Sequence, residues 1–402
     1  MRYADHIAAS FPDLAEGLQR LDRLSFEMGP IRPPSEARSL LIRATRNCPW
    51  NRCQFCGTYS GQKFQLRSVE DIKGDIDAAQ AIAGEIQAMA AKMGQGATST
   101  QVAAMIYDSG PANPCVSNVA LWLGSGGETA FLQDANSLVM RTPDMVETLT
   151  YLKEKLPSIT RVTTYGRSKT AAGKKAGELG RLREAGLSRV HVGLETGYDP
   201  LLEYMQKGVT AREHIIGGRN IKEAGISLSE YVMPGLGGRK MSGGHARETA
   251  RVLSEIDPDY IRLRSLIVRR GTALRPQWES GDFEPLSEDE VVEEMGELIS
   301  GLHCQSYIVS DQMSNLLGDV QGKLPQDRQK ILGIIKKYLG AHPVERMRRK
   351  LEARATAYIN VRGALGELEA QVQEALQALD QESPDAPRKV EEAILALKDG
   401  FL

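Results

Sequence analysis

In the middle of the chain, short runs rich in β-branched and aliphatic residues alternate with segments whose apolar residues recur at helical spacing. The short runs predict buried strands, and the spaced segments predict amphipathic helices. The predicted strands are 40–44, 129–132, 161–165, 189–194, 226–232 and 260–268. The predicted helices include 68–92, 142–156, 179–185, 212–224 and 246–256. Strands and helices that alternate through short connections indicate a parallel sheet.

The second strand is the ambiguous one. Val119–Leu123 is a competing apolar run, and Gly124–Glu128 separates it from the run at 129–132. A short apolar run can belong to a strand or to a buried helix, so periodicity alone does not choose between them. We place the segment 94–115, which contains helix-like apolar spacing, as an insertion before this strand.

Four regions follow from the pattern. Apolar residues at helical spacing (Ile7, Phe11, Leu14, Leu18 and Leu21) predict a helix at the start of the chain. Beyond Gly271 the alternation stops, and the pattern predicts a capped helix from Ser287, a short strand at 306–309 and then charged helices. The predicted regions are an N-terminal helical segment 1–38, an α/β barrel 39–281, an α/β cover of that barrel 282–340 and a helical tail 341–402.

Three cysteines follow the first predicted strand. Cys48, Cys53 and Cys56 have four residues in the first gap and two in the second. Soft thiolates at such spacing suit an iron–sulfur cluster or zinc. A structural zinc site takes four protein ligands, and neither His nor a fourth Cys lies nearby in the sequence. Three cysteines would leave one iron of a 4Fe–4S cluster open to another ligand.

The sequence resembles the radical S-adenosylmethionine (SAM) superfamily, in its elongator-like and coproporphyrinogen-III-oxidase-like branch. The features that carry the resemblance are the cysteine loop, the strand that precedes it and the number of strands. The first cysteine gap of that family usually holds three residues, whereas it holds four here. The resemblance implies a partial (β/α)6 barrel, here with N-terminal and C-terminal helical additions. It also implies a 4Fe–4S cluster that reductively cleaves SAM to a 5′-deoxyadenosyl radical, which abstracts hydrogen from a substrate.

The resemblance further implies a set of SAM-binding residues. Asp134 or Asn136 would bind the amino group, with Glu128 of the Gly-Gly-Glu segment as the alternative. Glu195 would accept from the ribose hydroxyls. The full set of expected SAM ligands is Phe55, Asp134, Asn136, Arg167, Glu195, Lys207, Met233 and Gly235. For Lys207 and Arg167 an ordinary surface role stays open.

The substrate side is less defined by the sequence. Asp311 and Asn315 follow the predicted strand 306–309, and a helical turn would place both on one face, directed at the substrate. Two other functions stay open: a carrier of an iron–sulfur cluster, SAM or haem without turnover, and modification of RNA. The RNA hypothesis predicts that Arg346, Arg348, Arg349 and Lys350 share one exposed face.

Composition narrows the class of protein. The chain has 402 residues, a net charge of −2 and 41% hydrophobic residues, as expected for a globular protein rather than a strongly basic nucleic-acid binder. We expect no membrane span and no signal peptide, and five cysteines with three clustered indicate a reducing cytoplasm. The expected partners are a small-molecule or cofactor substrate and an electron donor such as flavodoxin or ferredoxin, with nucleic acid left open. We also expect an oxygen-sensitive protein.

Overall fold

A computed structural model describes residues 12–93, 97–108, 110, 113–175 and 177–400. The first two positions of the expected N-terminal helical pattern, Ile7 and Phe11, precede residue 12 and lie outside the described residues. From Pro12 to Leu21 the chain forms the helix α2.

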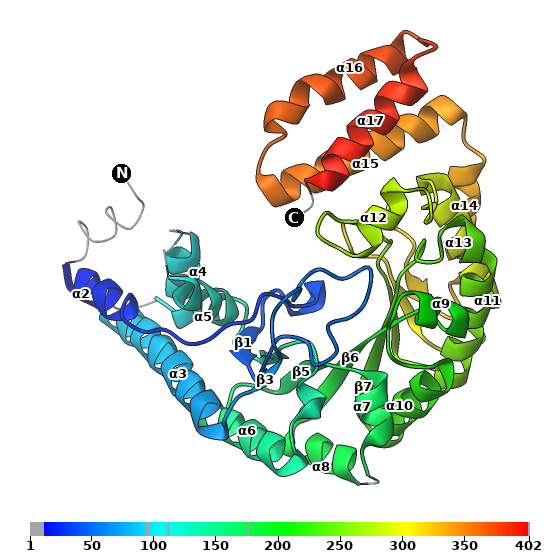
Figure 1. The fold of residues 1–402 in the computed structure, drawn as a ribbon. Coiled ribbons are helices and arrows are strands. Elements are labelled where there is room, and N and C mark those ends of the chain that lie inside the picture. The colour runs from blue at the N-terminus through cyan, green and yellow to red at the C-terminus, as the bar shows by residue number, and fades with distance from the viewer. Residues whose placement is uncertain (1–11, 94–96, 109, 111–112, 176, 401–402) are drawn as a thin grey trace. The chain divides into compact units, whose positions relative to one another are not determined.

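The sheet has eight strands in the order β1-β4-β5-β6-β7-β8-β9-β10 (Figure 1). Its strands are β1 (Leu40–Arg43), β4 (Thr129–Gln133), β5 (Arg161–Gly166), β6 (Leu187–Glu195), β7 (Ser227–Val232), β8 (Tyr260–Leu263), β9 (Tyr307–Val309) and β10 (Gly322–Lys323). The pairs β1–β4, β4–β5, β5–β6, β7–β8 and β8–β9 are parallel, and the pair β9–β10 is antiparallel. Neighbours in the sheet therefore follow one another along the chain, and the six-strand α/β barrel arrangement predicted from the sequence is confirmed.

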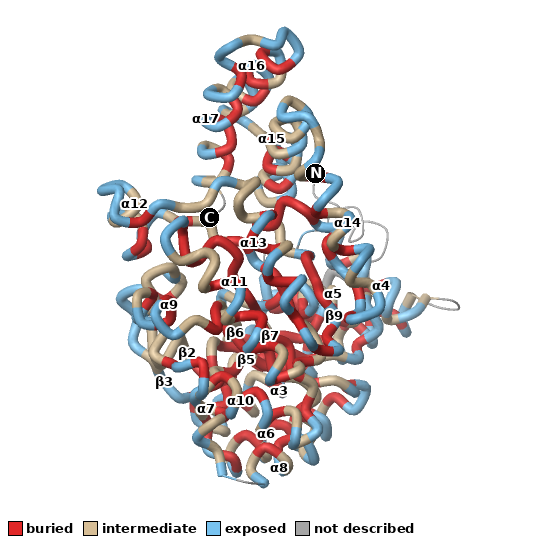
Figure 2. The backbone as a smooth tube through the Cα atoms, turned by 90° about the vertical axis from the view of Figure 1, so that its right-hand side faces the viewer, coloured by how far each residue is buried: buried red, intermediate tan, exposed pale blue. Residues whose placement is uncertain are grey.

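Helices connect the successive strands. They include α3 (Val69–Lys92), α6 (Thr142–Lys155), α8 (Glu178–Ala185), α10 (Ala211–Glu223) and α11 (Gly238–Ile256). The hydroxyl of Ser68 caps α3 by accepting from the Asp71 N–H at 3.1 Å. The residues Ile72, Ile76, Ala79, Ile82, Ile86 and Met89 are all buried. Their helical spacing is thus the core-facing stripe of α3, and Figure 2 shows the strands as a buried layer.

The competing second-strand assignment is wrong. Val119–Leu123 lies inside the helix α5 (Pro114–Gly124), which Asn113 caps by accepting from the Cys115 N–H. Gly126 and Gly127 then turn the chain with φ of 104° and 69°, and β4 follows. The Gly-Gly-Glu segment consequently lies at the amino end of β4, whereas Asp134 and Asn136 follow its carboxyl end.

The later elements extend the sheet. The predicted strand at 306–309 is β9, which joins β8 in parallel, while β8 ends at Leu263, earlier than expected. The helix α13 (Glu288–Gly301) has the expected capping box on Ser287, and it packs against α11 and α14 (Arg328–Leu339). No helical turn forms at 310–320, so the expected common face of Asp311 and Asn315 is absent from this segment.

Contacts divide the chain into two compact units. The first unit comprises Met1–Pro49, Gly61–Val192 and Gly217–Leu228, and the second comprises Trp50–Ser60, Gly193–Ile216 and Ser229–Leu402. The division passes through the cysteine loop and through β6.

The last three helices of the second unit form a bundle with its own core. They are α15 (Pro343–Arg362), α16 (Glu369–Asp380) and α17 (Ala386–Asp399), which lie side by side (Figure 1). A hydrophobic cluster formed only by residues of this bundle includes Leu351, Val372, Leu379 and Leu397. The bundle therefore carries its own apolar stabilisation.

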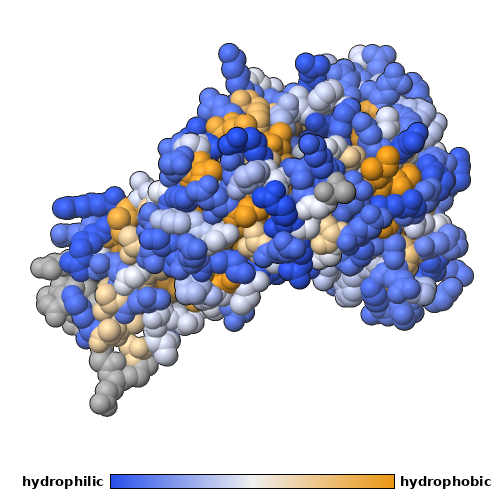
Figure 3. Space-filling view, turned by 90° about the horizontal axis from the view of Figure 1, so that it is seen from below, coloured by the Kyte–Doolittle hydropathy of each residue, from blue (hydrophilic) through white to orange (hydrophobic). Residues whose placement is uncertain are grey.

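Among the described residues, no helix combines the length and the apolar character that crossing a membrane requires. The face drawn in Figure 3 is mainly hydrophilic, with hydrophobic residues in small separate areas.

Candidate functional site

The cysteine loop runs from β2 (Thr45–Arg46) to β3 (Gln65–Leu66), directly after β1. Cys48 and Cys53 are partly exposed, Cys56 is exposed, and none of the three forms a disulfide. Asn47 and Asn51 take left-handed backbone conformations with φ of 67° and 48°, which Asn tolerates better than most residues. The three thiols are thus accessible to a ligand.

This loop fits an iron–sulfur cluster in donor type and accessibility. Thiolates are the ligands that hold such clusters in proteins. In the described part of the chain, however, no three Cys, His, Asp or Glu side chains are gathered as closely as a bound metal ion requires. The cysteines therefore supply suitable donors without forming a closed metal site by themselves.

In the second unit the loop is anchored on the segment after α9 (Asp199–Tyr204). The indole N–H of Trp50 donates to the Gln206 carbonyl at 2.7 Å, and the Gln54 N–H donates to the Met205 carbonyl at 3.0 Å. Gly208 has φ of 67°, and a Cβ there would lie 2.1 Å from the Trp50 ring. Only glycine therefore allows the Trp50 ring to lie against this segment.

Phe55, Glu195 and Lys207 come together in the second unit. Lys207 Nζ lies 3.2 Å from Glu195 Oε1 and 5.7 Å from the centre of the Phe55 ring. Both charged side chains are largely buried, with 13% of each exposed. A Cβ on Gly193 would lie 2.3 Å from Glu195 Oε1, so this glycine provides the room for the carboxylate. Three of the residues predicted to bind SAM thus form one contact group beside the cysteine loop.

The turn after β7 carries two further predicted residues. The Met233 N–H donates to the Glu195 carbonyl at 3.0 Å, which joins the ends of β6 and β7. The Gly235 N–H donates to Glu294 Oε1 of α13 at 2.6 Å. His245 Nε2 lies 3.1 Å from the Met233 carbonyl, which further fixes this turn. Sequence reasoning missed Glu294 and His245, although each is a polar residue on the apolar face of a helix.

Glu230 is another residue that the sequence reasoning missed. It lies in β7 with no exposed surface, and neither of its carboxyl oxygens has a hydrogen-bond partner among the described residues. Burial raises the pKa of Glu230 well above its ordinary value, and the charge of Glu195 raises it further, against a smaller opposing effect of Lys207. This shift favours the neutral, protonated form of the carboxyl group. An acid within an apolar strand was a signal visible in the sequence.

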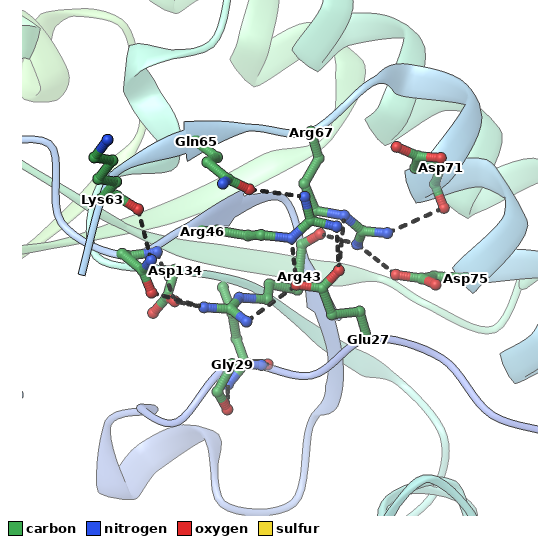
Figure 4. A network of polar contacts seen from close by, with 12 residues as sticks. Glu27, Gly29, Arg43, Arg46, Lys63, Gln65, Arg67, Asp71, Asp75 and Asp134 are labelled. Atoms are coloured by element: carbon green, nitrogen blue, oxygen red, sulfur yellow. Dashed lines mark hydrogen bonds and ion pairs between the residues drawn. The ribbon is translucent and has the colours of Figure 1, made fainter. Parts of the chain in front are cut away.

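Asp134 belongs to a polar network in the first unit (Figure 4). Its Oδ2 accepts from Arg43 Nη2 at 2.8 Å and from the Asn47 N–H at 3.3 Å. Arg43 Nη1 also donates to Glu27 Oε1 at 3.0 Å. Because Asn47 immediately precedes Cys48, Asp134 holds the first end of the cysteine loop.

Glu27 is the centre of the same network. Arg46 donates to both of its carboxylate oxygens, at 2.7 and 2.6 Å, and Arg67 Nε lies 3.4 Å from Oε2. The hydrogen bond from Arg46 holds the pKa of Glu27 below its ordinary value. Glu27, in the segment after α2, thus contacts arginines on both sides of the cysteine loop.

Asn136 and Arg167 meet at the start of α7 (Ser168–Gly173). The Arg167 N–H donates to Asn136 Oδ1 at 3.0 Å, and Asn136 Nδ2 donates to the Thr170 hydroxyl at 2.9 Å. Asn136 is 1% exposed. Its amide therefore connects the end of β4 to this short helix.

Asp311 and Asn315 have different surroundings. Asp311 is exposed, and its Oδ2 accepts from Arg262 Nη1 at 2.8 Å. Asn315 is buried, where it accepts from the Ser265 N–H at 2.8 Å and donates to the Leu263 carbonyl at 2.7 Å. Asn315 thus connects its loop to the end of β8, while Asp311 pairs with an arginine of that strand.

The four basic residues proposed as an RNA-binding face make contacts within the second unit. Arg346 and Lys350 lie 3.8 and 3.3 Å from Asp289 of α13. Arg348 pairs with Asp380 of α16, and the Arg349 guanidinium lies 5.5 Å from the centre of the Tyr338 ring. The four residues therefore contact three different side chains: Asp289, Asp380 and Tyr338.

The chain resembles known proteins only over part of its length or at low identity. No family model matches it. It is 28% identical over 122 residues to a tRNA uridine(34) acetyltransferase of Methanocaldococcus jannaschii, which is 29% of this chain. The match spans only 22% of that relative.

Solved structures with related architecture include Elp3 of Methanocaldococcus infernus with an N-terminal deletion. The match has a TM-score of 0.38 at 18% identity and covers 45% of this chain and 46% of that one. A second is the cobalamin-dependent S-adenosylmethionine radical enzyme OxsB, with a TM-score of 0.41 at 11% identity, covering 90% of this chain and 58% of that one. The family expected from the cysteine loop is thus represented among the neighbours, but TM-scores below 0.5 carry no functional argument for this chain.

Proposed function

We propose that this protein is a radical SAM enzyme. The observation that supports it most is the meeting of Phe55, which lies between Cys53 and Cys56, with the Lys207–Glu195 ion pair. A carboxylate, an ammonium group and the aromatic ring that lies between Cys53 and Cys56 in the sequence provide contacts for the ribose, carboxylate and adenine of SAM.

Cys48, Cys53 and Cys56 would hold a 4Fe–4S cluster. When bound, this cluster supplies the electron that cleaves SAM to the 5′-deoxyadenosyl radical, which abstracts hydrogen from an unidentified substrate. The residues of the chain position the reactants and exclude water. Asp134 already accepts from Arg43 and Asn47, so as a ligand of the SAM amino group it would share its carboxylate with them.

Anaerobic reconstitution with iron and sulfide tests this proposal. We expect about four irons per chain, and release of 5′-deoxyadenosine when SAM and dithionite are added. Cys48→Ala, Cys53→Ala and Cys56→Ala should each lose the cluster and the release of 5′-deoxyadenosine. Cys304→Ala, at a buried cysteine outside the loop, is the matched control and should retain both.

Two results would contradict the proposal. Full SAM cleavage in any one of the three loop variants would remove that cysteine from the cluster. Stable binding of cluster and SAM without any 5′-deoxyadenosine would favour a carrier function.

A second candidate function is modification of tRNA, which the 28% identity with a tRNA uridine(34) acetyltransferase favours. The contacts of Arg346, Arg348 and Lys350 with acidic residues of this chain weigh against the particular face that the sequence suggested. Measurement of tRNA binding against salt concentration would test it, because phosphate contacts give a steep salt dependence. Absence of binding at low salt would exclude this candidate.

A further inference from the structure

Four acidic residues of the described chain are buried: Glu36, Asp134, Glu230 and Glu294. Three of them have close polar partners. Glu36 accepts from Ser39 and Arg161, Asp134 from Arg43 and Asn47, and Glu294 from Gly235 and Ser242. Among the buried side-chain atoms without a hydrogen-bond partner in the described residues, only those of Glu230 are carboxyl oxygens.

This arrangement is unfavourable for the fold alone. Leaving a buried polar group without its hydrogen bonds costs about 1–3 kcal/mol relative to a paired one. An apolar side chain of similar length would fill the same space in β7 without that cost. A bound ligand, in contrast, could supply the missing partners.

The position of Glu230 is close to the candidate site. It interacts electrostatically with Glu195 and Lys207, the ion pair that lies against Phe55 of the cysteine loop. Its strand, β7, also leads directly into the Met233–Gly235 turn, whose first residue is hydrogen-bonded to Glu195. The unpartnered carboxyl thus belongs to the same group of residues as the predicted SAM ligands of the second unit.

The chemistry of a neutral carboxyl group narrows the ligand. It offers one O–H donor next to one carbonyl acceptor. The complementary surface is a planar edge that carries an acceptor beside a donor, as in an amide, a lactam or a nucleobase. An ionised carboxylate could only accept, so it could not recognise such an edge.

We propose that Glu230 is a ligand-binding residue that pairs with a planar acceptor–donor edge, of the amide or nucleobase type, bound beside the Glu195–Lys207 pair. This inference rests on the proposed function in one respect: it takes the residues around Glu195 to be the ligand-binding site. The edge can belong to the adenine of SAM or to a separate substrate, and two binding measurements distinguish these sources.

The experiment uses the reconstituted full chain and three variants. Glu230→Gln keeps a donor beside an acceptor, whereas Glu230→Met removes both at similar length. Ser229→Ala is the matched control, because Ser229 is equally buried with an unpartnered hydroxyl but points to the other face of β7. The probes are SAM, uridine, and 3-methyluridine, which lacks the donor of the uracil edge.

We expect Glu230→Met to weaken binding of SAM or of uridine about 10-fold or more, which corresponds to at least ~1.4 kcal/mol. Glu230→Gln and Ser229→Ala should bind that probe nearly as the wild type does. Weakening for SAM would assign the edge to the cofactor. If Glu230→Met binds uridine more weakly, and the wild type binds 3-methyluridine poorly, the edge belongs to a substrate.

A pH series separates this role from a structural one. Wild-type binding of the recognised probe should fall at alkaline pH, as Glu230 ionises and loses its donor, while Glu230→Gln should show no such fall. The inference is overturned if Glu230→Met binds both probes as tightly as the wild type, or if the wild type binds neither. If Glu230→Met weakens uridine binding but the wild type never cleaves SAM, the proposed function is refuted while this inference stands.

Discussion

Glu36 in the first unit and Glu230 in the second are both fully buried glutamates, yet their surroundings differ completely. Arg161 donates to both oxygens of Glu36, at 2.8 and 2.9 Å, and His191 Nε2 lies 3.4 Å away. Burial alone would raise the pKa of Glu36, but the contacts with His191 and Arg161 outweigh it and hold the pKa at about 2. Among the described residues Glu230 has no hydrogen-bond partner, and burial raises its pKa.

The comparison separates two uses of a buried acid. A carboxylate surrounded by donors stabilises the fold, because removing any member leaves a buried charge unpaired. A buried acid with no hydrogen-bond partner destabilises the fold, and its donor and acceptor are left for a ligand.

The largest expected effect is at Glu36. Glu36→Gln should lower the free energy of unfolding by roughly 3 kcal/mol at pH 7, because a folded pKa of about 2 against an ordinary value of 4.5 favours the folded state. The stabilisation is present above pH 4.5 and is lost as pH falls toward 2, so the two proteins should converge in acid. Urea denaturation at several pH values measures this, and equal stability at pH 7 would contradict it.

A smaller effect on ligand binding compares the two ends of β4. Asp134→Ala should raise the dissociation constant for SAM at least ~10-fold, about 1.4 kcal/mol. Glu128→Ala should change it little, because Glu128 lies just before the amino end of β4. Equilibrium dialysis of both variants decides this. The opposite order would make Glu128 the ligand of the amino group.

The comparison predicts an effect of opposite sign at Glu230. Glu230→Met should raise the free energy of unfolding of the ligand-free protein by about 1 kcal/mol at pH 8, because it removes an unpartnered buried acid. The folded pKa of Glu230 is raised, so wild-type stability falls as pH rises above the ordinary value of 4.5. The advantage of the variant should therefore shrink in acid. A loss of stability at pH 8 would show that Glu230 has a structural partner.

The smallest effect is expected at an exposed ion pair. Arg388 Nη1 lies 2.9 Å from Glu392 Oε1 one helical turn away in α17, and both side chains are more than half exposed. Arg388→Ala should leave the free energy of unfolding nearly unchanged, because water screens an exposed ion pair. A melting temperature close to that of the wild type would show that this exposed pair contributes far less to stability than Glu36 does.

Local pattern was enough to predict most of the barrel. The core-facing stripe of α3 and the capping box on Ser287 are present, because helix periodicity and caps depend on residues a few positions apart. The same reasoning could not assign 119–123, because a short apolar run reads alike in a buried helix and in a strand. The sequence pattern also predicted a strand that continues beyond Leu263, where β8 ends. An apolar run does not indicate where pairing with the neighbouring strand stops.

For the candidate site, the sequence by itself determined which chemistry is available: three thiols after the first strand, and Glu195 at the end of β6. Only the tertiary structure decided which carboxylates are already occupied. The partners of Asp134 and Glu36 come from segments far away in the sequence, such as Arg43 and Arg161. Packing likewise decides that Glu230 has no hydrogen-bond partner among the residues the structure describes. A carboxyl group's pKa and its availability to a ligand depend on what surrounds it in space, and distances across the fold are not encoded in local spacing.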